Sequence, residues 1–306
     1  MYRTPRALLP IAIFVAILAV STSSLLIRFA QMDGMPSLVI AALRLTFAAL
    51  LIAPLALTRH IDELKRFTRT EWLLGAASGI FLAVHFATWI SSLEYTSVAS
   101  SVVFVATGPL WVAVLSSLLL REHITRVAAF GLAVALVGGI IIGISDACQW
   151  NGSLSCPALG DILQGRAMWG NFLALCGAWA VTGYLIIGRK LRGGTSLMPY
   201  IFLVYGMAAI ALIIFMFVSG KSPLGFAPRT YGWVFLLAAV PQLIGHSTYN
   251  WALKYLPATL VAVITLGEPV ASAALAFFFL NEVQTLITLT GGGLILVGIY
   301  LTSSGK

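Results

Sequence analysis

The feature that most constrains this chain is a series of ten apolar stretches, each close to the length of a membrane-spanning helix. A helix needs roughly 20 residues to cross a hydrocarbon core of about 30 Å. Lipid offers the backbone no hydrogen-bond partner, and the stretches are too long and too continuously apolar for barrel strands, so we expect all ten to be helices. Their predicted bounds are 8–28, 38–57, 72–92, 98–120, 126–145, 168–188, 198–218, 231–253, 258–280 and 284–302.

The composition indicates that a bilayer is the main solvent of the chain. Hydrophobic residues make up 60% of the 306 residues and charged residues only 9%, against about 25% charged in an ordinary soluble domain. The net charge of +8 does not indicate a nucleic-acid partner, because the cations lie in short connections between apolar stretches. The predicted fold class is therefore an all-α polytopic membrane protein.

The distribution of Lys and Arg predicts the orientation in the membrane. With a cytoplasmic N-terminus, the opposite face carries Arg28, Arg166, Lys221 and Arg229. The cytoplasmic face then carries Arg3, Arg6, Arg59, Lys65, Arg66, Arg69, Arg121, Arg126, Arg189, Lys190, Arg192, Lys254 and Lys306. The positive-inside rule therefore predicts a bacterial inner-membrane protein with both termini in the cytoplasm. Residues 146–167 then form an extracytoplasmic loop, in which Cys148 and Cys156 either form a disulfide or stay as free thiols.

An internal repeat is the most informative pattern in the chain. A shift of 160 residues places the segment 93–125 on 253–285 without a gap. The positions that keep their identity under this shift are Leu93, Tyr95, Val103, Pro109, Ala113, Leu115, Leu120, Glu122, Thr125, Gly131, Leu136, Val137 and Gly138. Apolar composition alone would match Leu and Val by chance, but not Tyr, Pro, Glu and Thr in one register.

The repeat predicts two five-helix units, residues 1–145 and 168–306, joined by the loop at 146–167. Because five is odd, the second unit enters the membrane from the opposite side, and the repeats are expected to be inverted. Inverted repeats in membrane proteins usually accompany alternating access around a substrate site near the midplane. The alternative is that the repeat is only a remnant of gene duplication.

The segments "ASSVVFVATGPLWVAVLSSLLLREHIT" and "ATLVAVITLGEPVASAALAFFFLNEVQT" resemble the paired EamA-type signature of the drug/metabolite transporter superfamily, with an apolar run, a mid-helix Pro and a terminal Glu followed by Thr. Arg44 in "LRLTFAAL" resembles that family's second-helix arginine. The resemblance covers nearly the whole chain and is nearest to bacterial YddG-type amino-acid exporters. It implies export of small metabolites, above all amino acids including aromatic ones, with organic cations or drugs as alternative solutes. One departure is Gly108 before Pro109, where the second copy has Glu268 before Pro269.

Glu268 is the first candidate for a site, because an ionisable side chain deep in an apolar stretch is costly in hydrocarbon. It lies about midway along its stretch beside Pro269, which is expected to kink the helix, as is Pro109 in the first copy. Glu268 can bind a substrate amine or carry a proton. The alternative is a structural glutamate bonded to backbone that the proline leaves free.

Two histidines have polar or aromatic neighbours at helical spacing. Trp89 follows His85 by four residues, so both side chains point from one face. A second polar stripe, expected to line a cavity, contains Gln242, His246, Tyr249 and Asn250. For each histidine the alternative is a packed residue bonded to a neighbouring carbonyl.

Most of the eight Trp and nine Tyr residues fit an interfacial belt. Trp179 lies deeper, and Trp169 opens its helix at the outer mouth, where it can gate a cavity. Aromatic faces around a carboxylate suit an ammonium group through cation–π attraction, worth up to about 2 kcal/mol. Arg28 and Arg44 lie towards the outer ends of their helices, and Arg28 is interpreted as an anchor that reaches the interface.

Two other classes of function were compared with transport. An intramembrane enzyme would have to use His85, His246 and Glu268, but no H-E-x-x-H or G-x-S-x-G spacing occurs and four scattered His residues make a poor metal site. A passive channel does not need the alternating access that an inverted repeat provides. No cofactor or metal is expected, and ATP is not the direct driver because there is no Walker A motif. The expected partners are a small-molecule substrate and the lipid bilayer, and one chain that holds both halves can act as a monomer.

Overall fold

Helices cover the predicted apolar stretches in the computed structural model, which describes residues 8–120, 125–145, 149–150, 154–155, 165–256, 258–265 and 267–304. Some stretches form one helix each, namely α3 (Ser37–Arg59), α5 (Arg69–Ser92), α8 (Arg126–Ser145), α10 (Arg166–Arg192), α11 (Leu197–Val218) and α16 (Leu286–Ser304). The others are interrupted, namely α1 (Leu8–Ser21) with α2 (Ser23–Met32), α6 (Val98–Val105) with α7 (Gly108–Leu120), α12 (Pro228–Leu237) with the π-helix η1 (Ala238–His246) and α13 (Ser247–Ala252), and α14 (Ala258–Ile264) with α15 (Gly267–Leu280).

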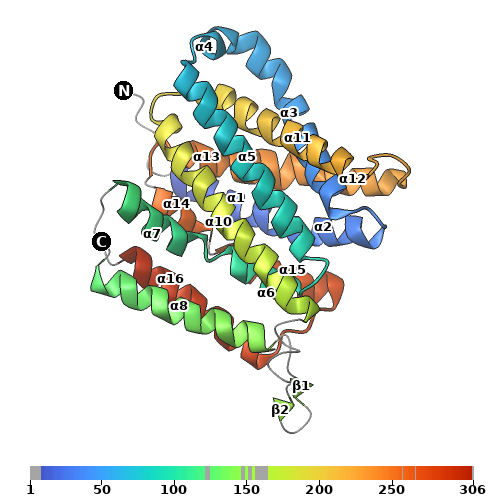
Figure 1. Ribbon diagram of the computed structural model, residues 1–306, viewed down its shortest axis with the longest axis vertical. Helices are drawn as coiled ribbons and strands as arrows, with labels where there is room; N and C mark the ends of the chain where they lie inside the picture. The colour runs from blue at the N-terminus through green and yellow to red at the C-terminus, as the bar shows by residue number, and fades with distance from the viewer. Residues whose placement is uncertain are drawn as a thin grey trace.

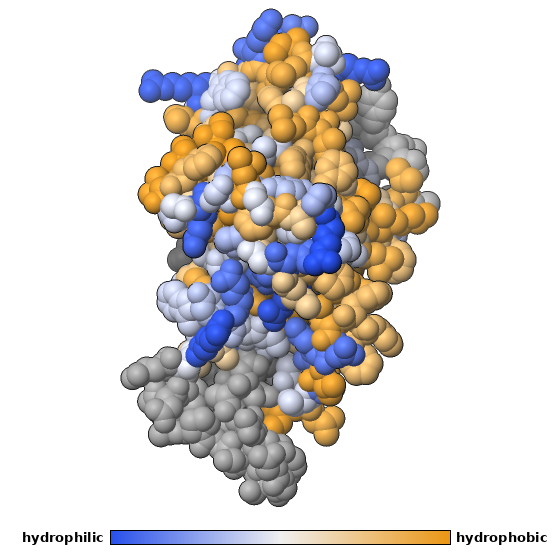
Figure 2. All heavy atoms as spheres, turned by 90° about the vertical axis from the view of Figure 1, so that its right-hand side faces the viewer, coloured by the Kyte–Doolittle hydropathy of each residue, from blue (hydrophilic) through white to orange (hydrophobic). Residues whose placement is uncertain are grey.

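The surface of the bundle is suited to lipid. Within the described ranges, six helical stretches are long and apolar enough to cross a bilayer, and two further apolar helices are shorter. Large apolar side chains such as Phe14, Leu50 and Phe217 are about 60% exposed, at 61%, 63% and 60%. In Figure 2, hydrophobic residues form much of the outline of the molecule, while hydrophilic residues are scattered over the middle of the face shown. These observations confirm the predicted all-α polytopic membrane fold.

Two connections contain short elements of their own. The connection between α3 and α5 holds the helix α4 (Ile61–Lys65). The predicted loop at 146–167 contains the strands β1 (Gln149–Trp150) and β2 (Leu154–Ser155), which pair antiparallel. Cys148, Cys156 and Glu122 lie outside the described residues, so the alternatives for the two cysteines stay open. Cys176, expected as a small buried residue, is a half-buried free thiol.

Helices of the first half pack mainly on helices of the second half. The most extensive contacts join α8 to α16, α5 to α10, α3 to α11, α5 to α11 and α1 to η1, and α6 also packs on α15. Figure 1 shows α8 and α16 side by side and α10 running along α5. The two halves are therefore interleaved, and their shared boundary runs through the centre of the molecule.

One end of the bundle is held by ion pairs between connections. Arg229, in the first turn of α12, donates to Asp33 at 2.6 Å, which links α12 to the α2–α3 connection. Burial on its own would raise the pKa of Asp33, but hydrogen bonds from Arg229 and Thr230 together with the guanidinium charge keep that pKa below its usual value. Arg28 donates to the Thr96 carbonyl at 2.9 Å and pairs with Glu282 at 3.4 Å. Arg28 therefore joins helices, which its interpretation as a lipid-interface anchor did not include.

The opposite end of the bundle has its own contacts. The backbone N–H of Ser196, between α10 and α11, donates to Glu63 of α4 at 2.7 Å. Arg189, near the end of α10, donates to the Leu253 carbonyl at 2.6 Å. The helices thus alternate between two ends, as expected for a chain that crosses a bilayer repeatedly.

Glycines allow α8 and α16 to approach closely. A Cβ built on Gly298 would lie 2.5 Å from the Gly131 carbonyl oxygen, and one on Gly138 would lie 2.5 Å from the Gly291 carbonyl oxygen. The two contacts involve residues that the 160-residue repeat relates to each other, because Gly131 matches Gly291 and Gly138 matches Gly298. Small residues of this kind are the usual means of close helix packing in membranes.

We expect Gly298→Ala to destabilise the protein, because the added methyl group must push the two backbones apart, at a cost of about 1–3 kcal/mol. Thermal unfolding in detergent would show a lower Tm. Gly293→Ala is the matched control on the same helix, since nothing lies within 4 Å of its Cβ position. Equal Tm values for the two variants would contradict the close packing of α8 on α16.

Candidate functional site

Two helix interruptions face each other at the centre of the bundle. In the first half, α6 ends at Val105 and α7 begins at Gly108. In the second half, α14 ends at Ile264 and α15 begins at Gly267. Pro109 and Pro269 lie in the first turn of α7 and α15, where a missing backbone N–H costs nothing. The prolines therefore begin new helices, whereas the sequence predicted kinks in continuous ones.

A cavity lies against both interruptions, with about 710 Å³ of space not occupied by atoms, part of it open to the outside. Its walls come from both halves of the chain. The first half contributes Val20, His85, Trp89, Val102, Val105, Ala106, Gly108 and Pro109. The second half contributes Val181, Tyr184, Leu185, His246, Tyr249, Ala262, Thr265, Glu268 and Pro269.

Repeat-related positions meet in this cavity. The pairs that the 160-residue shift relates are Trp89 with Tyr249, Val102 with Ala262, Val105 with Thr265, Gly108 with Glu268 and Pro109 with Pro269. The two halves thus present the same backbone positions, but their chemistry differs because the second half supplies a carboxylate and a hydroxyl. A solute in the cavity would meet one apolar and one polar wall.

Glu268 is the acidic residue of the cavity wall. Its side chain is half-buried, and its carboxylate accepts a hydrogen bond from the Tyr249 hydroxyl at 2.8 Å. Among the described residues, no cation forms a salt bridge with it. A carboxylate with one hydrogen bond has acceptor capacity left for a ligand donor.

The two histidines differ in their partners. The His85 Nδ1 donates to the Gly177 carbonyl at 2.9 Å, and the ring stacks on Trp89 with centroids 5.7 Å apart. His246 Nε2 and Trp89 Nε1 are buried and have no hydrogen-bond partner in the described part of the chain. Unpaired buried polar atoms on a cavity wall are the places where a polar ligand gains most.

The polar stripe on the eighth predicted stretch divides between the cavity and the core. His246 and Tyr249 line the cavity, but Gln242 and Asn250 are fully buried behind it. Asn250 accepts from the Tyr184 hydroxyl at 2.7 Å and donates to the Tyr205 hydroxyl at 3.2 Å. The stripe was predicted from a period of 3.6 residues, whereas η1 winds more widely around Pro241.

The structure brings neither Trp169 nor Trp179 to the cavity. Trp169 is 51% exposed and lies against Phe172, and Trp179 is 43% exposed and packs on Trp111 with centroids 5.5 Å apart. Both side chains point from α10 towards the surface of the bundle. Their depth in the sequence could not show which side of that helix they occupy.

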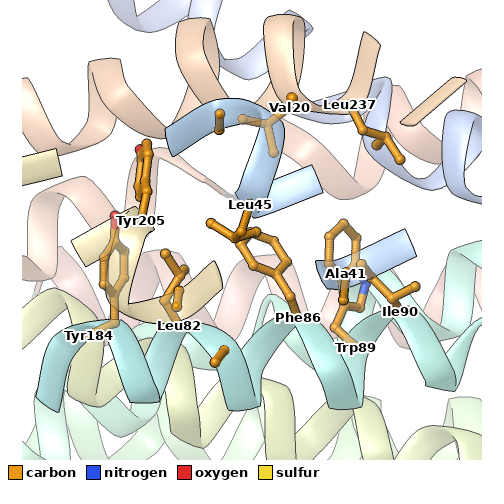
Figure 3. Packing of buried hydrophobic residues seen from close by; sticks show 14 of the residues in the cluster. Val20, Ala41, Leu45, Leu82, Phe86, Trp89, Ile90, Tyr184, Tyr205 and Leu237 are labelled. Carbon is orange, nitrogen blue, oxygen red and sulfur yellow. The ribbon is translucent and has the colours of Figure 1, made fainter. Parts of the chain in front are cut away.

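Arg44 is a charged residue near the site that the sequence reasoning left out of the cavity set. It is fully buried, its Nε donates to Gln242 Oε1 at 3.0 Å, and its guanidinium lies 4.0 Å from the centre of the Phe86 ring. Figure 3 shows Phe86 and Trp89 projecting together from α5. The signal that could have found it is the isolated charge in "LRLTFAAL".

An interleaved helical bundle with a central cavity that holds a carboxylate, two histidines and aromatic rings defines a multi-pass membrane transporter. A profile of the EamA-like transporter family matches residues 9–144 and again residues 168–304. The chain belongs to the EamA-like transporter family. The double match also agrees with the internal repeat in the sequence.

The similar proteins are themselves described as transporters or membrane proteins. An uncharacterized transporter of Archaeoglobus fulgidus is 25% identical over 286 residues, which is 89% of each chain. The inner membrane protein YtfF of Escherichia coli is 24% identical over 263 residues, 80% of this chain and 79% of that one. A protein of known crystal structure superimposes with a TM-score of 0.66 at 18% identity, over 97% of this chain and 96% of the other, and shows the same fold.

We expect the two histidines to respond differently to replacement by Phe. His85→Phe loses the hydrogen bond to Gly177, which is worth about 1 kcal/mol, so Tm should fall. His246→Phe removes a buried nitrogen that has no partner, so Tm should stay or rise. Thermal unfolding of both variants in detergent checks this, and a larger loss in the His246 variant would contradict the geometry.

Proposed function

We propose that the protein exports small zwitterionic metabolites, above all amino acids including aromatic ones, by alternating access around the central cavity. The observation that carries this proposal is a single carboxylate, Glu268, set among aromatic rings in a cavity whose walls come from both halves. An amino acid has an ammonium group for such a carboxylate and a side chain for apolar walls. The resemblance to YddG-type exporters supports the same solute class.

Equivalent contacts at opposite ends of the bundle support an inverted relation between the halves. Gln31 Nε2 donates to the Ile90 carbonyl at 3.0 Å, beside the Asp33 connection. Arg192 Nε donates to the Asn250 carbonyl at 3.0 Å, beside Ser196 at the other end. Ile90 and Asn250 are 160 positions apart, and Gln31 and Arg192 are 161 positions apart. An inverted repeat is the arrangement in which alternating access needs only a rocking of one half against the other.

A cluster at one end of the cavity is suited to act as a gate. Glu282 accepts the backbone N–H of Val98, at the start of α6, at 3.0 Å, and it also pairs with Arg28 of α2. The cluster ties the end of α15 to α6 and α2, so opening at this end must break it. The excess of cations at the other end supports an extracytoplasmic position for this gate.

The recognition of the substrate rests on the polar wall for its charge and on the apolar wall for its side chain. Glu268 takes the ammonium group, and the faces of Trp89 and Tyr249 contact it through cation–π attraction. The valine-rich part of the cavity takes an aliphatic or aromatic side chain. Organic cations are the second candidate class of solute, because the same carboxylate among aromatic rings would bind them.

We expect purified protein in liposomes to take up radiolabelled amino acids with saturable kinetics. We also expect counterflow, because an alternating-access carrier exchanges solute bound on one side for solute bound on the other. A panel of amino acids, organic cations and sugars at equal concentration ranks the solutes. Flux that rises linearly with concentration, without counterflow, would indicate a channel. Absence of flux for every amino acid together with uptake of organic cations would replace the proposed solute class.

Glu268→Gln tests whether the carboxylate carries a proton. If it does, an imposed pH gradient should no longer drive uptake in the variant, while exchange of solute for solute continues. Gly108→Ala, at the repeat-related position, is the matched control, because its Cβ has ordinary contact distance to Val181, at 3.5 Å. An unchanged response of the Gln variant to the gradient would exclude Glu268 as a proton carrier.

A further inference from the structure

Arg44 is a buried cation with most of its donors unused. Its guanidinium has five N–H groups, and the one on Nε bonds to Gln242. Nη1 and Nη2 are buried and have no acceptor among the residues that the structure describes. A buried charge without a counter-charge paired to it is unfavourable in a membrane interior, and such residues usually serve a ligand or a pathway.

The surroundings of Arg44 lack an anion at contact distance. No carboxylate forms a salt bridge with it in the described ranges, and Glu268 acts on it only through space. Its side-chain contacts include the amide of Gln242 and the ring of Phe86. The two unpaired Nη groups provide a bidentate match for a small planar anion such as a carboxylate.

Phe86 separates Arg44 from the cavity in this conformation. Its ring centre lies 4.0 Å from the guanidinium carbon and 5.4 Å from the centre of the His246 ring. Its centre is also 6.2 Å from that of Trp89, and both His246 and Trp89 line the cavity. The guanidinium thus lies one aromatic layer behind the cavity wall, and a rotation of Phe86 would expose it.

We propose that Arg44 is the carboxylate subsite of the transported solute, while Glu268 takes the ammonium group. The proposal rests on the proposed function and adds that the protein selects zwitterions over amines. When an amino acid is bound, Glu268 pairs with its ammonium group and Arg44 pairs with its carboxylate. An organic cation would satisfy Glu268 and leave Arg44 unpaired.

The experiment compares phenylalanine with its methyl ester and with phenylethylamine as competitors of amino-acid uptake in liposomes. For the wild type we expect both analogues to compete about 10- to 100-fold less strongly, the loss that accompanies one charge-assisted bidentate contact. In the Arg44→Gln variant, phenylalanine and phenylethylamine should compete equally for uptake. Arg229→Gln, which removes an arginine at the end of the bundle, should keep the wild-type preference.

The outcomes separate the subsite from the proposed function. Wild-type uptake of amino acids with equal competition by ester and amine would refute the subsite and leave the exporter intact. A wild type that carries no amino acid would refute the exporter itself. Retained preference in Arg44→Gln would also refute the subsite. If that variant does not fold, the comparison of the three ligands on the wild-type protein tests the subsite by itself. Arg44→Lys, which keeps the charge, should then show a reduced but measurable preference for phenylalanine.

Discussion

Within a bilayer the backbone has only protein to satisfy its hydrogen bonds, and this constraint shapes both the fold and the site. It requires continuous helices wherever the chain faces lipid, and it permits a break only where protein or a cavity can receive the free groups. The breaks before Pro109 and Pro269 both border the central cavity. A transporter gains two movable half-helices there without exposing unpaired backbone to hydrocarbon.

The same low-polarity environment makes each buried charge informative. Charges at the bundle ends, such as Asp33 with Arg229 and Arg28 with Glu282, form direct pairs and hold connections together. Glu268 and Arg44 lie in the interior and form no salt bridge with any described residue. Burying these two charges costs folding free energy, which a bound solute of matching charge pattern would offset. The two kinds of charge therefore differ in how they are paired, and the unpaired ones are the candidates for recognition.

The interleaving of the two halves links packing to transport. Because the main helix contacts join opposite halves, a movement of one half must shift its contacts with the other. The glycine contacts between α8 and α16 hold the outermost pair close, while the interrupted helices lie nearer the cavity. Rigid pairs at the margin and broken helices at the centre are a reasonable basis for rocking around a fixed site.

The ten apolar stretches, the 160-residue repeat and the polar residues inside them could be predicted from the sequence, because hydrophobicity, length and register are properties of the chain itself. Glu268, His85, Trp89, His246 and Tyr249 were found in this way, and all of them line the cavity.

Side-chain direction could not be predicted, because it depends on how each helix is rotated against its neighbours. Trp169 and Trp179 face outward, and Gln242 and Asn250 turn into the core around the π-helix. Arg44 and Arg28 could be placed along their helices by counting, but their partners come from stretches far away in the sequence. The sequence by itself determined a repeated membrane bundle with a few buried polar groups; only the tertiary structure decided which of them share a cavity, because contacts between distant helices are set by packing.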